Sequence, residues 1–278
     1  MPRILALLAA ASAFGALPAL AQAPAPAAPA AAPEMTLTRL DCGTPQPPIA
    51  VNERFSDNFQ YGDKKIQFVY SCYVIKHGDD YMLWDTGFAP STPNTGPKAS
   101  IVDQLAQLNI KPEQIKFVGI SHFHGDHTGQ VASFPKATLL IGQAEWAAIT
   151  APTPAPGVNH APFEGWKKGD NKVEPLPNDK DVFGDKSVIV LATPGHTPGH
   201  RSLMVKLKSK TYILSGDAVH FRENFDTNGV PWFNFDRAQS LASMDRIKGL
   251  IKSQKATLII QHDERDIAKL PKFPAGAK

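Results

Sequence analysis

Apolar positions along this chain come mostly in short runs that favour β-strands, and only a few stretches have helical spacing. Runs rich in β-branched and aromatic residues predict strands at residues 35–40, 66–76, 81–84, 116–120, 138–141, 187–192, 202–207, 211–214 and 257–260. Helical spacing predicts helices at residues 99–108, 143–149 and 237–251. Residues 74–83 predict a hairpin that turns at Gly78 and Asp79. Runs of strands interrupted by single helices predict two mixed sheets flanked by helices.

The N-terminus has the pattern of a secretory signal peptide. A positive start is followed by an apolar run at residues 4–20, and small residues precede a cleavage site after Ala21. A membrane anchor that stays in place is the alternative, which is disfavoured because the run contains Gly15 and Pro18 and is short for a bilayer span. We therefore expect a signal peptide at residues 1–21 and a mature protein that is periplasmic or secreted.

The rest of the chain divides into a linker and one folded domain. Residues 22–33 are almost only Ala and Pro, which predicts an extended, solvated linker. Residues 34–278 then form the domain, and 42% hydrophobic residues in a chain of 278 are enough for one sizeable core. No segment after the signal peptide is apolar enough to cross a membrane, so we expect no membrane association of the mature protein.

The charge of the chain argues against a nucleic-acid partner. The formal net charge is only +3, and the Lys and Arg residues are scattered rather than gathered in one block. We expect a small molecule as the binding partner instead. The sequence leaves the oligomeric state open, with a homodimer as one option.

The chain has two cysteines, Cys42 and Cys72. They could pair in an oxidising compartment such as the periplasm. Cys72, however, lies inside the apolar run at residues 68–75, which is typical of a core position. Two buried thiols in separate strands are therefore the preferred interpretation, and a disulfide is the alternative.

The most informative segment is residues 121–129, which directly follows a predicted strand. His122, His124, Asp126 and His127 lie within it, although the whole chain has only 9 His. A chance cluster of this density is improbable. Imidazole nitrogens and carboxylate oxygens at this spacing are the ligands that suit zinc and related divalent ions. The segment therefore predicts a metal site.

Further candidate ligands follow other predicted strands. His196 comes soon after the strand at residues 187–192, Asp217 after the strand at 211–214, and His262 at the end of the last strand. Each of them alone is a weak signal, because a single His or Asp at a strand end is ordinary. Together with the first cluster they predict a site built where apolar strands stop.

This order of ligands resembles the signature of the metallo-β-lactamase superfamily. The pattern His-x-His-x-Asp-His is followed by His, Asp and His, and Asp85-Thr86-Gly87 resembles the Asp-Thr-Gly turn of that family. The resemblance covers nearly all of residues 34–278. It implies an α/β fold with four layers, the αββα sandwich, and a site along one edge of the two sheets. It also implies two divalent metal ions, which we expect to be Zn²⁺.

The resemblance assigns a role to each candidate ligand. The first metal would be held by three imidazoles, those of His122, His124 and His196. The second metal would be held by Asp126, His127 and His262, with Asp217 bridging both ions. Asp85 would support the site without binding metal. Asp126 is expected to be essential for catalysis as well as for metal binding.

A hydrolase gains a nucleophile from such a site. Zinc lowers the pKa of bound water from 15.7 to about 7, which makes hydroxide available at neutral pH for on the order of 12 kcal/mol less. A hydroxide bridging the two metals could then attack a carbonyl or phosphorus centre.

Asp217 narrows the expected substrate class. Lactam-cleaving relatives usually have Cys or Ser at this position, so Asp217 points to the branches that cleave lactones, thioesters or phosphotriesters. Residues 71–75 resemble the corresponding segment of the N-acyl-homoserine lactonases. The leading prediction is an exported metal-dependent hydrolase that opens the lactone ring of N-acyl-homoserine lactones, which is quorum quenching.

His220 departs from the lactonase pattern. Some lactonases have Tyr three residues after the bridging Asp, whereas His at this place resembles phosphotriester-cleaving relatives such as methyl parathion hydrolase. His220 is the second expected catalytic residue, as a hydrogen-bond donor to a developing oxyanion or an acid for the leaving group. A packed histidine at a strand end is the alternative.

Other functions rank below lactone hydrolysis. A phosphotriesterase or arylesterase is second and a β-lactamase third. Thioester cleavage of the glyoxalase kind ranks lower, because no basic segment for glutathione stands out. A zinc-binding module without enzymatic activity ranks last, since a complete dinuclear ligand set is hard to explain without chemistry.

Two long irregular stretches, residues 150–169 and 221–235, are expected to supply an aromatic substrate wall. Its predicted members are Phe163, Trp166, Phe221, Phe225, Trp232, Phe233 and Phe235. Trp146 lies on a helical face and is expected in the core. His200 is expected to be structural, and His77 and His160 to be turn and loop residues.

Overall fold

The computed structural model describes residues 33–154, 157–158 and 160–278. The predicted signal peptide and all but the last residue of the predicted linker lie outside the described residues. Within the described part of the chain, no helix combines the length and apolarity that a membrane crossing requires.

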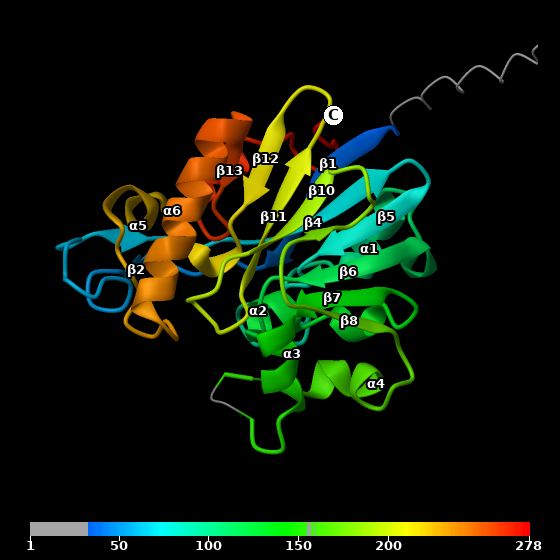
Figure 1. The fold of residues 1–278 in the computed structure, drawn as a ribbon, viewed down its shortest axis with the longest axis horizontal. Coiled ribbons are helices and arrows are strands. Elements are labelled where there is room, and N and C mark those ends of the chain that lie inside the picture. The colour runs from blue at the N-terminus through cyan, green and yellow to red at the C-terminus, as the bar shows by residue number, and fades with distance from the viewer. Residues whose placement is uncertain (1–32, 155–156, 159) are drawn as a thin grey trace, which may run out of the picture. The chain divides into compact units, whose positions relative to one another are not determined.

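A six-stranded mixed sheet forms the first half of the domain (Figure 1). Its strands follow the order β1 (Met35–Gly43), β4 (Tyr70–His77), β5 (Asp80–Trp84), β6 (Ile115–Ile120), β7 (Thr138–Gly142) and β8 (Val173–Leu176). The pairs β1–β4 and β4–β5 are antiparallel, and the remaining pairs are parallel. The hairpin predicted at residues 74–83 is confirmed: His77 pairs with Asp80, and Gly78 takes a φ of 59° in the turn.

A five-stranded sheet forms the second half. Its strands follow the order β13 (Thr257–Ile259), β12 (Thr211–Leu214), β11 (Arg201–Lys206), β10 (Val188–Ala192) and β9 (Lys180–Asp181). The β12–β13 pair is parallel and the others are antiparallel. Two short strands, β2 (Ile49–Ala50) and β3 (Lys65–Ile66), pair with each other outside both sheets.

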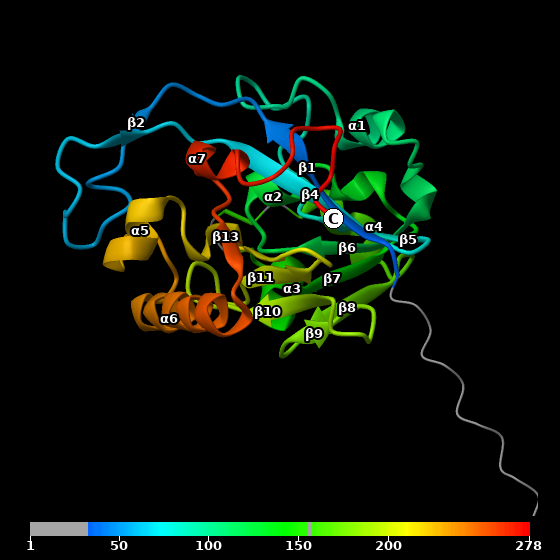
Figure 2. The same ribbon diagram turned by 90° about the horizontal axis from the view of Figure 1, so that it is seen from above.

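The two sheets pack face to face, with helices on their outer sides. In β4 the side chains alternate: Tyr73 and Ile75 pack between the sheets, whereas Cys72 and Val74 pack toward the outer helices. The outer core of the six-stranded sheet includes residues of α1 (Ile101–Gln107), α3 (Gln143–Thr150) and α4 (Glu164–Lys167). The outer core of the five-stranded sheet includes residues of α6 (Arg237–Gln254). Figure 2 shows α1 and α6 on opposite sides of the sheets, which confirms the αββα sandwich.

The remaining helices are short. They are α2 (Gly125–Thr128), α5 (Arg222–Thr227), α7 (Glu264–Ile267) and the 3₁₀ turns η1 (Pro112–Gln114), η2 (Val131–Ser133), η3 (Ala161–Phe163) and η4 (Gly216–Ala218). The predicted helix at residues 99–108 begins later, at Ile101, because Ser100 caps it. The Ser100 hydroxyl accepts a hydrogen bond from the Asp103 N–H, and the Asp103 carboxylate accepts one from the Ser100 N–H.

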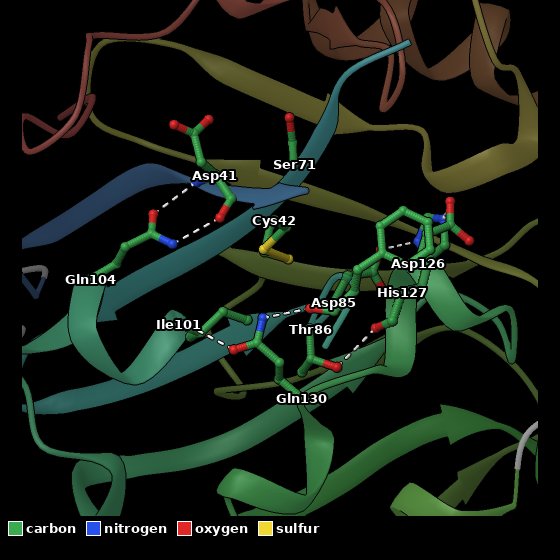
Figure 3. The surroundings of a disulfide bond; sticks show 12 residues. Asp41, Cys42, Ser71, Asp85, Thr86, Ile101, Gln104, Asp126, His127 and Gln130 are labelled. Atoms are coloured by element: carbon green, nitrogen blue, oxygen red, sulfur yellow. Dashed lines mark hydrogen bonds and ion pairs between the residues drawn. A yellow bond between two sulfur atoms is a disulfide. The ribbon is translucent and has the colours of Figure 1, made fainter. Parts of the chain in front are cut away.

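Cys42 and Cys72 form a disulfide, so the preference for two free thiols is wrong. The reason is strand pairing between distant segments. Leu40 of β1 lies opposite Cys72 of β4, and an irregularity between Asp41 and Gly43 shifts the register near Cys42. The two Cα atoms lie 5.7 Å apart, and both residues are buried in the outer core (Figure 3).

Candidate metal centre

The predicted ligands all lie where strands of the two sheets end. His122 follows β6, and Asp126 and His127 belong to α2 directly after it. His196 lies in the loop between β10 and β11, and Asp217 lies in η4 after β12. His262 follows β13. The site therefore draws on both sheets, which meet at this edge.

One group of side chains consists of His122, His124, His196 and one oxygen of Asp217. Nδ1 of His124 lies 2.9 Å from Nε2 of His122 and 3.1 Å from Nε2 of His196. Oδ2 of Asp217 lies 3.7 Å from Nε2 of His122 and 3.6 Å from Nε2 of His196. All the ligand atoms of this group lie within 4.8 Å of one another. Three nitrogens and one oxygen so placed can surround one divalent ion.

A second group consists of Asp126, His127, His262 and the other oxygen of Asp217. Oδ2 of Asp126 lies 3.5 Å from Nε2 of both His127 and His262. Oδ1 of Asp217 lies 3.3 Å from Nε2 of His127 and 3.0 Å from Nε2 of His262. This group too lies within 4.8 Å. The two oxygens of Asp217 thus face different groups, which is the geometry of a bridging carboxylate.

The chemistry of these side chains fits divalent metal ions. The buried atoms Nε2 of His127 and Oδ1 of Asp217 have no hydrogen-bond partner. Burial lowers the pKa of His122 and His196 well below its ordinary value, so both imidazoles are neutral, the form that binds metal. Burial works against ionisation of Asp217, but the charges of His262 and His127 outweigh it and hold its pKa well below the usual range.

Asp85 contacts the ring nitrogen of His127 that faces away from the second ligand group. Its Oδ1 accepts a hydrogen bond from the Ser121 N–H at 2.7 Å, and its Oδ2 lies 2.9 Å from Nδ1 of His127. The adjacent Thr86 donates from its backbone and its hydroxyl to the His127 carbonyl. Figure 3 shows Asp85, Thr86 and His127 pointing toward one another. The expectation that Asp85 supports the site agrees with this geometry.

The Asp-Thr-Gly turn rests on the disulfide. Gly87 has a φ of 59°, and a Cβ there would lie 2.4 Å from Cβ of Cys42. Only a residue without a side chain fits this approach and this backbone conformation. The Phe88 N–H also donates to the Cys42 carbonyl at 3.0 Å. The covalent link between β1 and β4 is therefore packed directly against the turn that holds His127.

The imidazoles of His122, His196 and His262 are also oriented through their second ring nitrogens. Nδ1 of His122 lies 3.0 Å from Oγ of Ser121, and Nδ1 of His196 lies 2.9 Å from Oδ1 of Asn234. Nδ1 of His262 lies 2.8 Å from the Val69 carbonyl. Such partners fix the tautomer and the ring orientation of metal-binding histidines.

His200 has structural contacts, as expected, whereas His77, predicted in a turn, is the last residue of β4, and His160 lies in a loop as predicted. The backbone N–H of Asp217 donates to Nε2 of His200 at 2.9 Å, and Nδ1 of His200 lies 3.0 Å from the Thr193 hydroxyl. His77 stacks on Phe183 at the end of β4. Nδ1 of His160 contacts the Ile149 carbonyl.

A cavity of about 560 Å³ opens onto both ligand groups. Of the seven aromatic residues predicted to form the substrate wall, Phe233 alone lines this cavity, so that prediction is mostly wrong. Phe163 and Trp166 are buried in the core between the six-stranded sheet and its helices, and Phe221 and Phe225 pack in other clusters. Trp232 and Phe235 are exposed. Trp146 packs against the core, as expected.

The cavity wall comes instead from the N-terminal part of the domain. The aromatic residues that line it there are Phe55, Phe68, Tyr70 and Phe88, and Arg54 and Ile49 join them. The sequence pattern did not predict these wall residues. Two signals were present: aromatic residues alternate at Phe68 and Tyr70, and Phe88 directly follows the Asp-Thr-Gly turn. The guanidinium of Arg54 lies over the rings of Phe55 and Phe233.

His220 lies in the same cavity, beside the bridging carboxylate. Its Nε2 is 3.3 Å from Oδ2 of Asp217, and its ring packs against Phe55 and Phe68. Its Nδ1 is buried without a hydrogen-bond partner. His220 is therefore close to any molecule that would bind at the two ligand groups.

Comparisons with known proteins agree with this fold and site. The sequence profile described as the metallo-beta-lactamase superfamily matches residues 67–262. The chain is 31% identical over 178 residues to the N-acyl homoserine lactonase AttM of Rhizobium radiobacter, an alignment that covers 62% of this chain and 67% of the relative. It is 30% identical over 227 residues to an N-acyl homoserine lactonase of Bacillus sp., covering 73% of this chain and 85% of that relative.

Solved structures share the fold. An N-acyl homoserine lactone hydrolase with N-hexanoyl-L-homoserine bound at its catalytic metal centre has a TM-score of 0.73 and 22% identity, covering 88% of this chain and 100% of that chain. AidC, a dizinc quorum-quenching lactonase, has a TM-score of 0.66 and 20% identity, covering 84% and 89%. The family profile, the fold and the converging histidines and aspartates together establish that this chain belongs to the metallo-β-lactamase superfamily, as a metal-dependent hydrolase.

Proposed function

We propose that this protein is an exported enzyme that opens the lactone ring of N-acyl-homoserine lactones at a site with two metal ions. The observation that carries this proposal is the position of the Asp217 carboxylate. Its two oxygens face two separate ligand groups in a cavity lined by aromatic residues. The relatives named lactonases support the choice of substrate.

The proposed ligands of the first ion are His122, His124, His196 and Oδ2 of Asp217. Those of the second ion are Asp126, His127, His262 and Oδ1 of Asp217. Zn²⁺ is the proposed ion, because imidazole and carboxylate ligands suit it and the structural neighbour AidC is a dizinc enzyme. When bound, the two ions would activate water at neutral pH and stabilise negative charge on the substrate oxygen.

The protein's own side chains orient the substrate and handle its protons. The aromatic rings of Phe55, Phe68 and Phe233 offer an apolar surface for an acyl chain. His220 is placed to donate a hydrogen bond to the oxygen on which charge develops, or a proton to the leaving alkoxide. Asp126 is proposed to be essential because it contributes the carboxylate that completes the second group.

Export is the second part of the proposal. It rests on the signal-peptide pattern of residues 1–21. The disulfide between Cys42 and Cys72 supports it, because such bonds form and persist in oxidising compartments such as the periplasm.

A second candidate function is the hydrolysis of phosphotriesters or aryl esters. The observation that favours it is His220 in the cavity, at a position where some lactonases have Tyr. The cavity itself is compatible with an aryl group as well as an acyl chain.

The first test is a substrate panel with the zinc-loaded mature protein. Acid release from a long-chain acyl-homoserine lactone is followed with a pH indicator, and paraoxon and a chromogenic cephalosporin are assayed in parallel. Fast lactone opening that a chelator abolishes supports the proposal. Cleavage of paraoxon or the cephalosporin without lactone opening would overturn the choice of substrate and leave the metal centre in place.

A further inference from the structure

A second buried carboxylate, that of Glu145, lies outside both ligand groups. Glu145 is on α3 and is fully buried. Its Oε2 accepts a hydrogen bond from the Phe123 N–H at 3.0 Å, and its Oε1 accepts one from the Gly199 N–H at 2.7 Å. Its hydrogen bonds therefore serve other segments.

Those two segments carry the imidazoles of the first group. Phe123 lies between His122 and His124, and Gly199 lies in the loop that contains His196. The first segment follows β6 of the six-stranded sheet, and the second connects β10 and β11 of the other sheet. Glu145 therefore joins two ligand segments that come from different sheets.

The loop of Gly199 is seated tightly on the start of α3. A Cβ at Gly199 would lie 2.6 Å from the backbone nitrogen of Glu145, and a Cβ at Gly142 would lie 2.0 Å from the Gly199 carbonyl. Both positions leave no room for a side chain. The loop that contains His196 is therefore in direct backbone contact with the helix that carries Glu145.

Burying this carboxylate is unfavourable by itself. Burial raises the pKa of Glu145 to about 7, while its hydrogen bonds and the charge of the buried Arg201 work in the other direction. A buried charge is tolerated when hydrogen bonds satisfy it. Two of the donors, the N–H groups of Phe123 and Gly199, belong to the two ligand segments, so the bonds that stabilise Glu145 also join those segments.

Asp85 and Glu145 both contact the segment that follows β6, at Ser121 and Phe123 respectively, but of the two Glu145 alone also contacts the His196 loop. Asp85 contacts His127 of the second group, whereas Glu145 contacts the segments that hold His122, His124 and His196. We propose that Glu145 is a positioning residue for the first metal ion, because it holds the His122–His124 segment and the His196 loop at the spacing that their imidazoles need. This inference rests on the ligand assignment of the proposed function.

The test measures metal affinity at one site at a time. His262→Ala impairs the second site and leaves the first, whereas His124→Ala impairs the first and leaves the second. Each protein, with and without Glu145→Ala, is equilibrated with Co²⁺ in chelator buffers, and the bound metal is measured by elemental analysis and by the visible absorption of Co²⁺. Glu145→Ala is expected to weaken Co²⁺ binding about 10- to 100-fold in the His262→Ala protein. It is expected to leave binding unchanged in the His124→Ala protein.

Two further variants separate positioning from general stability. Ile149→Ala removes a buried side chain from the same helix, without hydrogen bonds to either ligand segment, and should leave the Co²⁺ affinity of the first site unchanged. Glu145→Gln keeps the shape and one acceptor oxygen, so its affinity should lie between those of the wild type and Glu145→Ala. Equal weakening of both sites by Glu145→Ala, or the same weakening by Ile149→Ala, would overturn the positioning role. Wild-type protein that fails to bind two ions would overturn the ligand assignment, and the inference with it.

Discussion

The carboxylate of Asp85 lies 2.9 Å from Nδ1 of His127, and both side chains are completely buried. Asp85 itself has a φ of 57°, a left-handed conformation that places its carboxylate behind the imidazole. The opposite nitrogen of His127 faces the second ligand group. The orientation of this ligand is therefore set by a residue that does not touch the proposed ion.

Replacing Asp85 should weaken the binding of the second metal ion. Asp85→Asn removes the negative charge that orients His127, so we expect about 10- to 100-fold lower affinity for the ion of the second group. Metal-to-protein ratios after dialysis against graded chelator measure this. Asp80→Asn is the matched control, because Asp80 begins the strand β5 that Asp85 follows, and among the described residues its ion pair is with the exposed Lys116. Equal metal loss in both variants would contradict the orienting role.

Removing a proposed ligand from either group should abolish turnover without unfolding the protein. His124→Ala and Asp126→Ala each delete a side chain at the cavity rather than one in the sheet cores. We expect lactone opening to fall to the background rate, while circular dichroism keeps the wild-type spectrum. Retained turnover in either variant would refute the dinuclear mechanism. Treatment of the wild type with a chelator should give the same loss, and added Zn²⁺ should restore the activity.

His220→Ala should lower kcat at least tenfold. The imidazole lies in the cavity beside Asp217, where it can donate to a developing charge, and general acid catalysis supplies effects of this size or larger. The metal content should stay at the wild-type value. Steady-state kinetics and elemental analysis check both statements. His77→Ala serves as the control because His77 stacks on Phe183 outside the cavity, and an unchanged rate in His220→Ala would mean that His220 only packs.

Phe233→Ala should affect long acyl chains more than short ones. Phe233 is the aromatic residue of the 221–235 stretch that lines the cavity, and losing its apolar contact is worth roughly 1.4 kcal/mol, or about tenfold in KM. KM for a long-chain and a short-chain lactone should be compared in the same preparation. Phe235→Ala is the control, since Phe235 is 63% exposed. A uniform change across chain lengths would argue against an acyl-chain site here.

Glu223 should contribute stability that disappears in acid. Hydrogen bonds from Arg265 lower the pKa of Glu223 to about 2, from the ordinary 4.5 of a free carboxyl. A carboxyl with a depressed folded-state pKa stabilises the protein above about pH 4.5, and this contribution is lost as the pH falls toward 2. The wild type should therefore exceed Glu223→Gln in free energy of unfolding at neutral pH, and the difference should shrink over that interval.

The comparison is made by urea unfolding at each pH. Any acid loss of metal is common to the two proteins and cancels in the difference. Glu264→Gln provides the control, because Glu264 is exposed and has no ion pair among the described residues. A difference that stays constant between pH 7 and pH 2 would contradict the ion-pair explanation.

Two mixed sheets flanked by helices and the cluster of candidate ligands could be predicted from local pattern, whereas the four-layer αββα arrangement came from the resemblance to the metallo-β-lactamase superfamily. The end of a strand can be predicted from the end of an apolar run. Side chains that follow strands ending at the same edge of the sheets lie close together in the fold. The side chains of His122, His196, Asp217 and His262 come together for this reason.

Other features depend on contacts between distant segments, which local pattern does not carry. The disulfide requires the pairing of β1 with β4, and the cavity wall requires residues near Phe55 to lie over the sheet edge. Phe163 and Trp166 show the opposite case: they lie within the stretch at residues 150–169 that is predicted to be irregular, yet short helical turns place their rings in the core. The sequence pattern did not predict that Glu145 is buried, because a single acidic residue in a short helix is usually exposed.

The disulfide encloses the segment that forms much of the cavity wall. Cys42 and Cys72 are 30 residues apart, and Phe55 and Phe68 both lie between them. Closing a loop of this length reduces the entropy of the unfolded chain, typically by the equivalent of ~2–4 kcal/mol. Because both ends are fixed to neighbouring strands of one sheet, the length and composition of the intervening segment can change without shifting β1 or β4. The cross-link thus makes residues 44–67, which lie between β1 and the residues that contact His262, the segment through which the substrate range of this scaffold can be redesigned by loop grafting.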